Sequence, residues 1–373
     1  MFKSNDNQCM DVDYFNEMVN FLSSFVPNKT NIEEYKCFRF KENKVFVGDT
    51  DFCARYTLDD CNFGDRRFAI SAKVLIGLAN KLNVENQVKF ELKDDNILIK
   101  SGLYTGKFPI LTASEFNEFN EPIKTSKVPH DLLGGITFLS NSRSKKVHEA
   151  KRALLLGATL KGNCGYTTNM NMISKYEFDE KDELLDFIMP HTLFDMIKKN
   201  KLKPSEIGFD DRFIYVYYGN SICAKCKRYA TTSENYVDLK CFYDNIYTFD
   251  DMVKIDASLI DIISSIERLK IIKGSDGLSK LKITLLNSDE FKIENIDGNA
   301  RSEEIISCEA VVDKKDSYQA VSNADNLLYL FSQYKEDAKD KEDSNVSFYL
   351  SNTGKKMIIS NNKKSNVISC IKQ

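Results

Sequence analysis

Residues 71–119 read SAKVLIGLANKLNVENQVKFELKDDNILIKSGLYTGKFPILTASEFNEF, and this stretch decides the fold. Within residues 71–83 the apolar side chains recur at helical spacing and leave Lys and Asn on the opposite side. Residues 88–110 then form three strand-like runs, with the turn residues Asp94 and Asp95 between the first two. The stretch therefore predicts one helix followed by three strands.

The same unit recurs along the whole chain. Similar helices are predicted to begin near Asp13, Ser71, Pro129, Pro190, Asp256 and Asn323, at intervals of 58 to 67 residues. A repeat of this kind determines the architecture. Because one helix cannot cover three strands, we expect neighbouring units to pair. We predict an α+β chain of six pseudo-repeats in three domains, residues 1–122, 123–245 and 246–373.

Composition excludes several classes of protein. The 373 residues are 42% hydrophobic and carry a net charge of -3, so any DNA-facing surface must be a local basic patch. The N-terminal residues lack the apolar core of a signal peptide, and no apolar run is long enough to span a membrane. Ten scattered cysteines are typical of reduced thiols. We predict a cytoplasmic protein without membrane contact.

Two basic clusters follow predicted helices. They read SRSKKVHEAKR at residues 142–152 and KKNKLK at residues 198–203. Lys and Arg at such positions can contact phosphate groups, but they are equally common as solvated side chains on a helix surface. The residues alone do not distinguish between these two interpretations.

No motif predicts an enzyme, a metal site or a cofactor. The sharpest candidate is the pair Cys223 and Cys226, but a zinc site needs four ligands and no second pair supports it. In a strand, residues three apart also face opposite sides. The Gly-rich segments lack the Lys-Ser/Thr of a phosphate-binding loop, and no nucleophile, base and orienting acid can be assembled. We predict no catalytic activity and no cofactor.

Four segments resemble one known family. They are ISAKVLIGLANKL at 70–82, VKFELKDDNILIKSG at 88–102, FPILTASEFNEF at 108–119, and LIDIISSIERLKIIKGSDGLSKLKITLLNSDEFKIEN at 259–295. In these segments, and in the order of its units, the chain resembles the bacterial sliding clamp, the beta subunit of the replicative DNA polymerase. The resemblance implies a ring of two chains joined head to tail, with helices lining the hole and sheets outside.

The resemblance also implies a function. A sliding clamp is a processivity factor that encircles double-stranded DNA without reading its sequence and tethers the polymerase. A surface that slides needs Lys and Arg near phosphates rather than contacts with base edges. The residues that the resemblance assigns to DNA binding are Lys81, Arg143, Lys145, Lys146, Arg152, Lys198, Lys199 and Lys201.

The family has a hydrophobic pocket that receives short linear motifs of the polymerase, the clamp loader and repair proteins. The matching residues here are Leu155, Met170, Met172, Ile173, Val237, Phe242, Val367, Ile368 and Ile371. Two segments depart from the family pattern: TTNMNMIS at 167–174 stands where Thr-Asp-Gly-His-Arg-Leu is usual, and the tail ends SCIKQ where Met-Pro-Met-Arg is common. The methionines could form an adaptable apolar lining, or they could be ordinary packing.

Closure of the family's ring involves the first domain of one chain and the third domain of the other. Tyr104 and Phe108 match the first side, and Leu269 and Ile272 match the second. A head-to-tail contact of this sort must close, since an open one makes fibres. The alternative for Leu269 and Ile272 is that they belong to the core.

Two other hypotheses remain. A clamp-like adaptor encoded by a virus or plasmid would bind replication or repair proteins as a monomer without encircling DNA, and the divergent tail and pocket loop motivate this alternative. An unrelated enzyme of repeated α+β domains would turn over a nucleotide or nucleic-acid substrate.

Overall fold

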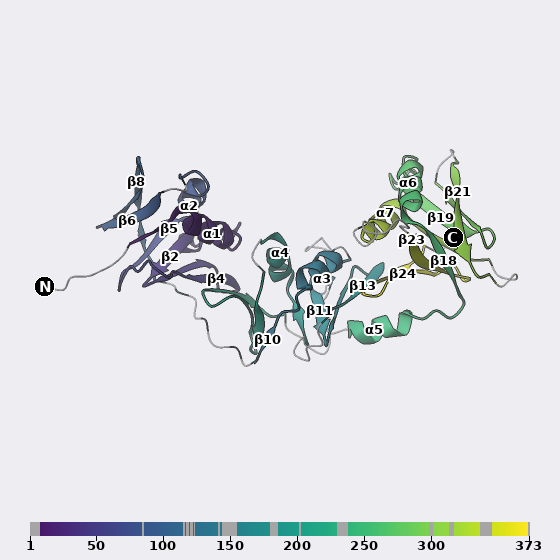
Figure 1. Ribbon diagram of the computed structural model, residues 1–373, viewed down its shortest axis with the longest axis horizontal. Helices are drawn as coiled ribbons and strands as arrows, with labels where there is room; N and C mark the ends of the chain where they lie inside the picture. The colour runs from purple at the N-terminus through teal and green to yellow at the C-terminus, as the bar shows by residue number, and fades with distance from the viewer. Residues whose placement is uncertain are drawn as a thin grey trace. The chain divides into compact units, whose positions relative to one another are not determined.

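The computed structural model describes residues 8–83, 86–114, 116, 119, 122, 124–140, 142–143, 155–179, 186–200, 203–229, 238–297, 301–312, 317–335 and 345–371. The chain forms two compact units. The first combines Met1–Leu133 with Ile188–Ala230, and the second combines Gly134–Phe187 with Thr231–Gln373. Both mix helices with antiparallel sheets, so the predicted α+β class is confirmed (Figure 1).

The chain repeats the order strand, helix, strand, strand, strand six times, which confirms the six pseudo-repeats and adds a leading strand that the sequence prediction missed. The first two copies are β1 (Cys9–Asp11), α1 (Val12–Ser23), β2 (Cys37–Lys41), β3 (Lys44–Gly48), β4 (Phe52–Thr57), and β5 (Arg67–Ser71), α2 (Ala72–Leu78), β6 (Gln87–Lys93), β7 (Asn96–Ser101), β8 (Tyr104–Pro109). The next two are β10 (Lys124–Lys127), α3 (Leu132–Leu139), β11 (Ala158–Lys161), β12 (Cys164–Thr168), β13 (Met172–Glu177), and β14 (Asp186–Met189), α4 (His191–Lys199), β15 (Glu206–Phe209), β16 (Phe213–Tyr218), β17 (Ile222–Lys227).

The last two copies are β18 (Met252–Ser258), α6 (Leu259–Leu269), β19 (Lys280–Leu285), β20 (Glu290–Asn295), β21 (Glu303–Ala310), and β22 (Gln319–Asn323), α7 (Ala324–Ser332), β23 (Asn345–Ser351), β24 (Lys356–Ser360), β25 (Lys364–Ser369). Outside the repeat lie a 3-10 turn (Glu33–Lys36), β9 (Leu111–Thr112) and α5 (Leu239–Ile246).

The first unit contains two sheets. One runs β1-β6-β7-β8 and the other runs β10-β15-β16-β17-β4-β3-β2-β5-β9. Strands β4 and β17 pair with Ala54 opposite Ala224, so the larger sheet continues from residues 1–122 into residues 123–245. Helices α1 and α2 lie side by side, as Figure 1 shows. The α1 residue Phe21 packs edge-on against Tyr218 of β16, with ring centroids 5.1 Å apart.

The second unit is organised around one long antiparallel sheet. Its strands run β11-β12-β13-β25-β24-β23-β18-β21-β20-β19-β22, and helices α6 and α7 lie side by side (Figure 1). Strands β13 and β25 pair with Ile173 opposite Val367. Strands from residues 123–245 thus contribute to the sheets of both units. The division into three domains stays a prediction.

Three local predictions were wrong. Helix α2 ends at Leu78 rather than near residue 83, because Asn80 adopts a left-handed φ of 62° and donates its backbone N–H to Asn16 Oδ1 of α1 over 2.8 Å. Helical spacing predicts one buried stripe of Leu259, Ile260, Ile263, Ile266 and Leu269. In α6, however, Ile260 is 62% exposed, whereas Ile262 is fully buried. Residues 231–245 are predicted to form an irregular bridge, but within the described part of this segment residues 239–246 form α5.

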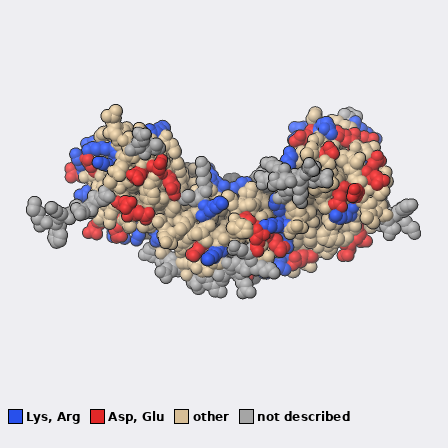
Figure 2. Space-filling model, viewed as in Figure 1, with Lys and Arg blue, Asp and Glu red and all other residues tan. Residues whose placement is uncertain are grey.

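The cores of the units are apolar, and surface charge is mixed. Figure 2 shows Lys and Arg interspersed with Asp and Glu over the visible surface of both units, as expected for a chain with net charge -3. Among the described residues, no helix is both long and apolar enough to cross a membrane.

Candidate functional site

Lysines from neighbouring strands contact both ends of helix α5. Its N-cap residue Asp238 accepts the backbone N–H of Cys241 over 3.1 Å and pairs with Lys161 Nζ of β11 over 2.8 Å. The hydrogen bond from Lys161 is the main reason that the pKa of Asp238 lies below its ordinary value. An acceptor and a negative charge at this end also suit the unpaired N–H groups and the dipole of the helix.

The other end of α5 is capped by Lys356 of β24. Its Nζ donates to the carbonyl of Thr248 over 2.7 Å, to the hydroxyl of the same residue over 2.9 Å, and to the carbonyl of Ile246 over 3.3 Å. Desolvation lowers the pKa of Lys356, while Asp250 and Asp251 oppose this shift. The three oxygens satisfy a partly buried ammonium. Lys356 therefore holds the helix end in place.

Helix α5 forms one wall of an apolar pocket of about 280 Å³ in the second unit. The lining comes from the β12–β13 loop, α5, the start of β24 and the end of β25. The residues are Thr168, Met170, Asn171, Met172, Ile173, Phe242, Ile246, Lys355, Lys356, Val367, Ile368 and Ser369. At the rim, the side chains of Met170 and Phe242 are 77% and 47% exposed. Exposed large apolar side chains beside a concave surface are typical of a protein-binding site.

The loop between β12 and β13 presents Met170 to solvent. Asn169 Oδ1 accepts the backbone N–H groups of Asn171 and Met172 over 3.1 and 3.0 Å. Met170 itself has a left-handed φ of 76°, which is costly for a side chain with a Cβ atom. Its backbone N–H donates to Thr168 Oγ1 over 3.1 Å, which helps to hold this conformation. The loop therefore places an adaptable side chain at the mouth of the pocket.

The last residue of β25 and the residue after it are hydrogen-bonded to two sides of the pocket. Ser369 donates its backbone N–H to the carbonyl of Asn171 over 2.9 Å, and Cys370 donates to the carbonyl of Lys355 over 2.8 Å. The pocket thus combines segments that are far apart in the sequence within one hydrogen-bonded frame.

The structure brings most of the sequence-predicted pocket residues together. Met170, Met172, Ile173, Phe242, Val367 and Ile368 line the pocket, whereas Leu155 and Ile371 do not. Val237 lies outside the described residues. Sequence reasoning missed Ile246, Lys355 and Lys356. The signal for Ile246 was present, because Leu239, Phe242, Tyr243 and Ile246 have helical spacing after the capping residue Asp238.

Unlike the pocket residues, the predicted DNA-binding residues lie on several separate segments of the chain. Lys198 and Lys199 are exposed in the last turn of α4, and Lys81 is exposed just after α2. Arg143 is half-buried, with its guanidinium 3.4 Å from the carbonyl of Leu156. The remaining four, Lys145, Lys146, Arg152 and Lys201, lie outside the described residues.

Not every helix presents positive charge. Helix α1 carries Asp13 and Glu17 and no Lys or Arg, and α6 carries Asp261 and Glu267 beside Arg268. In the described part of the chain, positive charge on the helices is strongest at the end of α4. Any contact with phosphates is therefore expected at helix ends and in the segments that follow them.

Two predicted interface residues lie on β8, the outer strand of the four-stranded sheet. Tyr104 and Phe108 are half-buried and their rings converge over Gly106, where a Cβ atom would lie 2.4 Å from Tyr104 Oη and 2.5 Å from the ring of Phe108. Glycine at this position leaves room for both rings. They form a small apolar patch on an open strand.

Leu269, one of the two residues predicted for the second side of the ring interface, is buried. Leu269 is 2% exposed and belongs to the core of the second unit, so it cannot contact another chain. It ends α6 facing inward, in phase with Ile262 and Ile266. Ile272 is half-buried, and its neighbour Ile271 is 77% exposed. Sequence spacing could not identify Ile271, because the helix ends just before it.

The cysteine pair lacks the environment of a metal or redox site. Cys223 and Cys226 are both buried in β17, and Cys226 Sγ lies 3.3 Å from Thr192 Oγ1. Burial raises the pKa of Cys223 to about 12 and that of Cys226 to about 11. Because metals bind the thiolate, protonated thiols in a strand are poor ligands.

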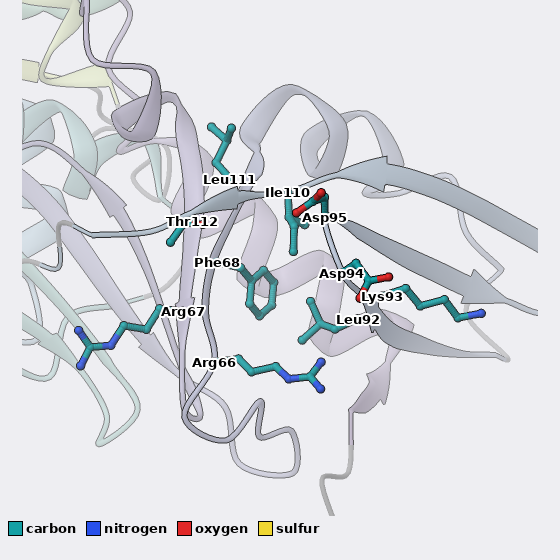
Figure 3. Close-up of a pocket in the computed structure, with 10 residues that line it drawn as sticks. All are labelled: Arg66, Arg67, Phe68, Leu92, Lys93, Asp94, Asp95, Ile110, Leu111 and Thr112. Carbon is teal, nitrogen blue, oxygen red and sulfur yellow. The ribbon is translucent and has the colours of Figure 1, made fainter.

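A second groove, of about 620 Å³, lies in the first unit, between β5, β9 and the turn from β6 to β7. Its charged side chains diverge. Figure 3 shows Arg67 and Lys93 pointing away from Phe68 and Leu92 in opposite directions. Arg67 instead lies 6.0 Å from the ring of Phe116. Because the cations do not converge, this groove does not form an anion site.

No family model matches the sequence, and a search of curated proteins finds no match either. Solved structures do match along nearly the whole chain, and they include DNA polymerase III beta subunits, the bacterial sliding clamps, from several organisms. The chain therefore has the sliding-clamp fold.

Three particular structures illustrate the likeness. The beta subunit from Thermotoga maritima is 15% identical, with a TM-score of 0.80. The sliding clamp from Bartonella birtlesii bound to griselimycin is 13% identical, with a TM-score of 0.81, and the beta subunit from Caulobacter crescentus is 12% identical, with a TM-score of 0.81. Each comparison covers 98% of this chain and 99% of the other. At these identities the likeness establishes the fold.

Proposed function

We propose that this protein is a DNA polymerase processivity factor, a sliding clamp that encircles double-stranded DNA and tethers a polymerase to its template. The observation that carries the proposal is the match of the fold over 98% of the chain to proteins described as polymerase subunits. The function depends on topology rather than on bond-making chemistry, so we propose that the chain catalyses no reaction and works in the cytoplasm, where bacterial DNA is replicated.

In this proposal two chains close a ring head to tail. Strand β8 is the end strand of its sheet, and residues 303–307 of β21 have no strand partner beyond β20 among the described residues. Two open edges on one chain favour strand pairing between copies. Lys107 on β8 and Glu303 with Glu309 on β21 add opposite charges, and Ile271 with Ile272 supplies the apolar contact for Tyr104 and Phe108.

DNA contact in the proposed ring is electrostatic and independent of sequence. The exposed Lys198 and Lys199 of α4, Lys81 after α2, and the basic segments 142–152 and 198–203 would lie near phosphates. The acidic residues of α1 and α6 would keep the duplex from binding too tightly to slide.

The apolar pocket is the proposed docking site for short linear motifs of the polymerase and of a clamp loader. Convergence of Met170, Phe242, Val367 and Ile368 on one concave surface supports this assignment. An extended peptide with two or three apolar side chains would fill a cavity of about 280 Å³.

Two measurements test the proposal: the mass of the protein in solution and its retention on circular DNA. Light scattering of the purified chain over a dilution series should give twice 42.7 kDa, the mass of one chain. After incubation with a nicked circular plasmid and a loader, the protein should co-elute with the plasmid and be released when the plasmid is cut. A stable monomer that still binds a polymerase would contradict the ring and leave the adaptor as the remaining function.

A further inference from the structure

We propose that the protein carries a second nucleic-acid surface, on the face of its nine-stranded sheet that is turned away from helix α1, and that this face binds single-stranded DNA. Lys41, Lys44 and Arg67 would contact the phosphates, and phenylalanine rings beside them would stack on the bases. The inference goes beyond the proposed function, which needs only double-stranded DNA enclosed by the ring.

The nine-stranded sheet has one face against helix α1 and one face turned away from it. Tyr56 of β4 contacts Tyr14 and Phe21 of α1, with ring centroids 5.6 and 6.5 Å apart. Its neighbour Arg55 lies on the opposite face, because successive side chains of a strand alternate. Figure 1 shows α1 and α2 on one side of β2 and β4. The face that carries Arg55 is the outer face.

The outer face is strongly basic. The register of β5, β2, β3, β4 and β17 assigns seven cations to it, namely Arg67, Arg39, Lys41, Lys44, Arg55, Lys225 and Lys227. These five strands and β16, all described in full, carry no Asp or Glu on this face. Positive charge is therefore concentrated on one face of a chain whose net charge is -3.

Carboxylates at the margin of the outer face have other partners. The sentence that follows from the contacts is short: Glu34 accepts the N–H and the hydroxyl of Ser114 over 3.0 and 3.1 Å, Asp51 pairs with Lys227 over 3.2 Å, and Asp210 accepts the Tyr215 hydroxyl over 2.7 Å. Of the cations on the face, only Lys227 has an ion pair among the contacts found in the described part of the chain. The marginal carboxylates therefore leave most of the positive charge in place.

Lys41, Lys44 and Arg67 form a row across three adjacent strands. Lys41 of β2 lies directly opposite Lys44 of β3 and Arg67 of β5. Like charges in directly opposed pairs destabilise a sheet. Although Glu42 lies in the turn between the two lysines, no ion pair or hydrogen bond of the three side-chain cations is found among the described residues. A bound anion would relieve this repulsion.

An aromatic ring lies beside the row. The ring centroid of Phe116 is 5.9 Å from Lys41 Nζ and 6.0 Å from the guanidinium carbon of Arg67. Phe116 also packs edge-on against Phe46 of β3, with ring centroids 5.4 Å apart. Because Phe116 is only half-buried, part of its ring reaches solvent next to the cations.

The alternation of cations and rings continues across β4 and β17. Arg55 of β4 and Lys225 of β17 each lie 5.1 Å from the ring centroid of Phe119. Lys225 also lies 4.4 Å from the ring centroid of Phe213 on β16. Lys225 is buried, whereas both rings are half-buried. The buried cation thus holds two rings at the surface by cation–π contacts.

Cations that alternate with partly exposed rings suit a single strand of nucleic acid, whose phosphates follow the cations while its bases stack on the rings. The row of three cations spans two interstrand distances, about 10 Å, which is long enough for the phosphates of about two or three nucleotides. An acidic protein segment would use the cations without the rings. Duplex DNA keeps its bases stacked on each other and would not use the rings either.

The test uses the full chain and a dT oligonucleotide of about thirty nucleotides that carries biotin at both ends. Immobilised on a streptavidin surface, this strand has no free end and cannot thread a closed ring, so surface plasmon resonance reports binding outside the hole. The variants are the pair Lys41→Gln with Lys44→Gln, the single change Phe116→Leu, and the control Lys89→Gln. Lys89 is an exposed lysine on β6 of the other sheet in the same unit. Circular dichroism verifies that all variants fold.

We expect the double variant to bind the anchored strand about tenfold more weakly at low salt and to lower the slope of log affinity against log salt by about 1.4. Phe116→Leu keeps an apolar side chain but removes the aromatic ring, so it should weaken binding about fivefold and leave the slope unchanged. Lys89→Gln should change neither quantity.

Equal binding of the double variant and the unmodified chain would overturn the inference. So would displacement from the anchored strand by a poly-glutamate peptide or a DNA hairpin duplex that is as effective as displacement by free dT, since the face would then be a site for acidic protein or for duplex. If the expected pattern is found but the chain is not retained on circular duplex DNA, the proposed ring fails and this inference stands.

Discussion

The side chains of Ser174 and Asn366 are hydrogen-bonded to each other, although the residues lie 192 positions apart in the chain. Ser174 also bonds to Ser142, and Asn366 Nδ2 donates to Tyr334 Oη over 3.0 Å, with all four residues buried. Ser174 follows the pocket residue Ile173, and Asn366 precedes Val367. The network therefore holds β13 and β25 together, the two strands that carry the pocket residues Ile173 and Val367.

Replacing Asn366 by Ala should destabilise the protein by about 1–3 kcal/mol, because the buried hydroxyls of Ser174 and Tyr334 would lose a partner. Urea unfolding followed by circular dichroism measures this change. The exposed Asn326 of α7 is the matched control, and Asn326→Ala should change stability by less than about 0.5 kcal/mol. Equal effects of the two substitutions would show that the network contributes little.

Replacing Phe242 by Ala should weaken binding of a polymerase peptide about tenfold, because an aromatic side chain at the edge of the pocket loses its apolar contact. Phe249 is a suitable control, since it is 40% exposed, close to the 47% of Phe242, but does not line the pocket. Isothermal titration calorimetry with the polymerase measures both. If Phe249→Ala weakens binding as much as Phe242→Ala, the pocket is not the docking site.

Replacing Ile271 by Asp should shift the protein from dimer to monomer. A 77% exposed isoleucine next to Ile272 is accessible to a second chain, and a buried carboxylate without a partner would oppose the contact. Light scattering at micromolar concentration reports the mass. Ile260→Asp serves as the control, because Ile260 is also exposed, at 62%, but lies in the first turn of α6. An unchanged dimer for Ile271→Asp would exclude this segment from the interface.

The double variant Lys198→Glu and Lys199→Glu should shorten the time that the protein stays on circular DNA. The loss of two phosphate contacts should reduce the slope of log affinity against log salt by about two. Lys36→Glu is the control, since Lys36 is paired with Glu33 over 2.5 Å. A salt slope equal to that of the unmodified chain would mean that the end of α4 does not face DNA.

Replacing Asp238 by Asn should make stability depend less on pH. The pKa of Asp238 is lowered in the folded chain, chiefly by Lys161, so its ionised form stabilises the fold above the ordinary value of 3.8 and this contribution is lost as pH falls through the lowered pKa. Asn keeps the capping acceptor and removes the charge. Urea unfolding at neutral pH should find the Asn variant less stable, and the difference should shrink as the pH falls below 3.8. A difference that is constant with pH would contradict this assignment.

The sequence predicted the repeated unit well, because helix and strand periodicity are local properties. The helical spacing of Leu193, Phe194 and Ile197 predicts one buried face, and all three are buried in α4. The predicted turn at Asp94 and Asp95 joins β6 to β7. Most pocket residues were found through the family resemblance, not through a pattern in the residues. Ile271 and Lys355 were missed, because neither residue lies within a helix or strand, and exposure between such elements has no periodic signal.

By itself, the sequence determined the α+β class and the order of six helix-and-strand units, since the spacing of apolar side chains selects helix or strand within each short segment. Tertiary structure alone decided which strands join into continuous sheets, where α2 ends, and which of two neighbouring residues faces the core. Each of these depends on partners far away in the chain. Asn16 accepts the N–H of Asn80, 64 residues away, just beyond the end of α2, and Lys356 caps α5, which ends 110 residues before it.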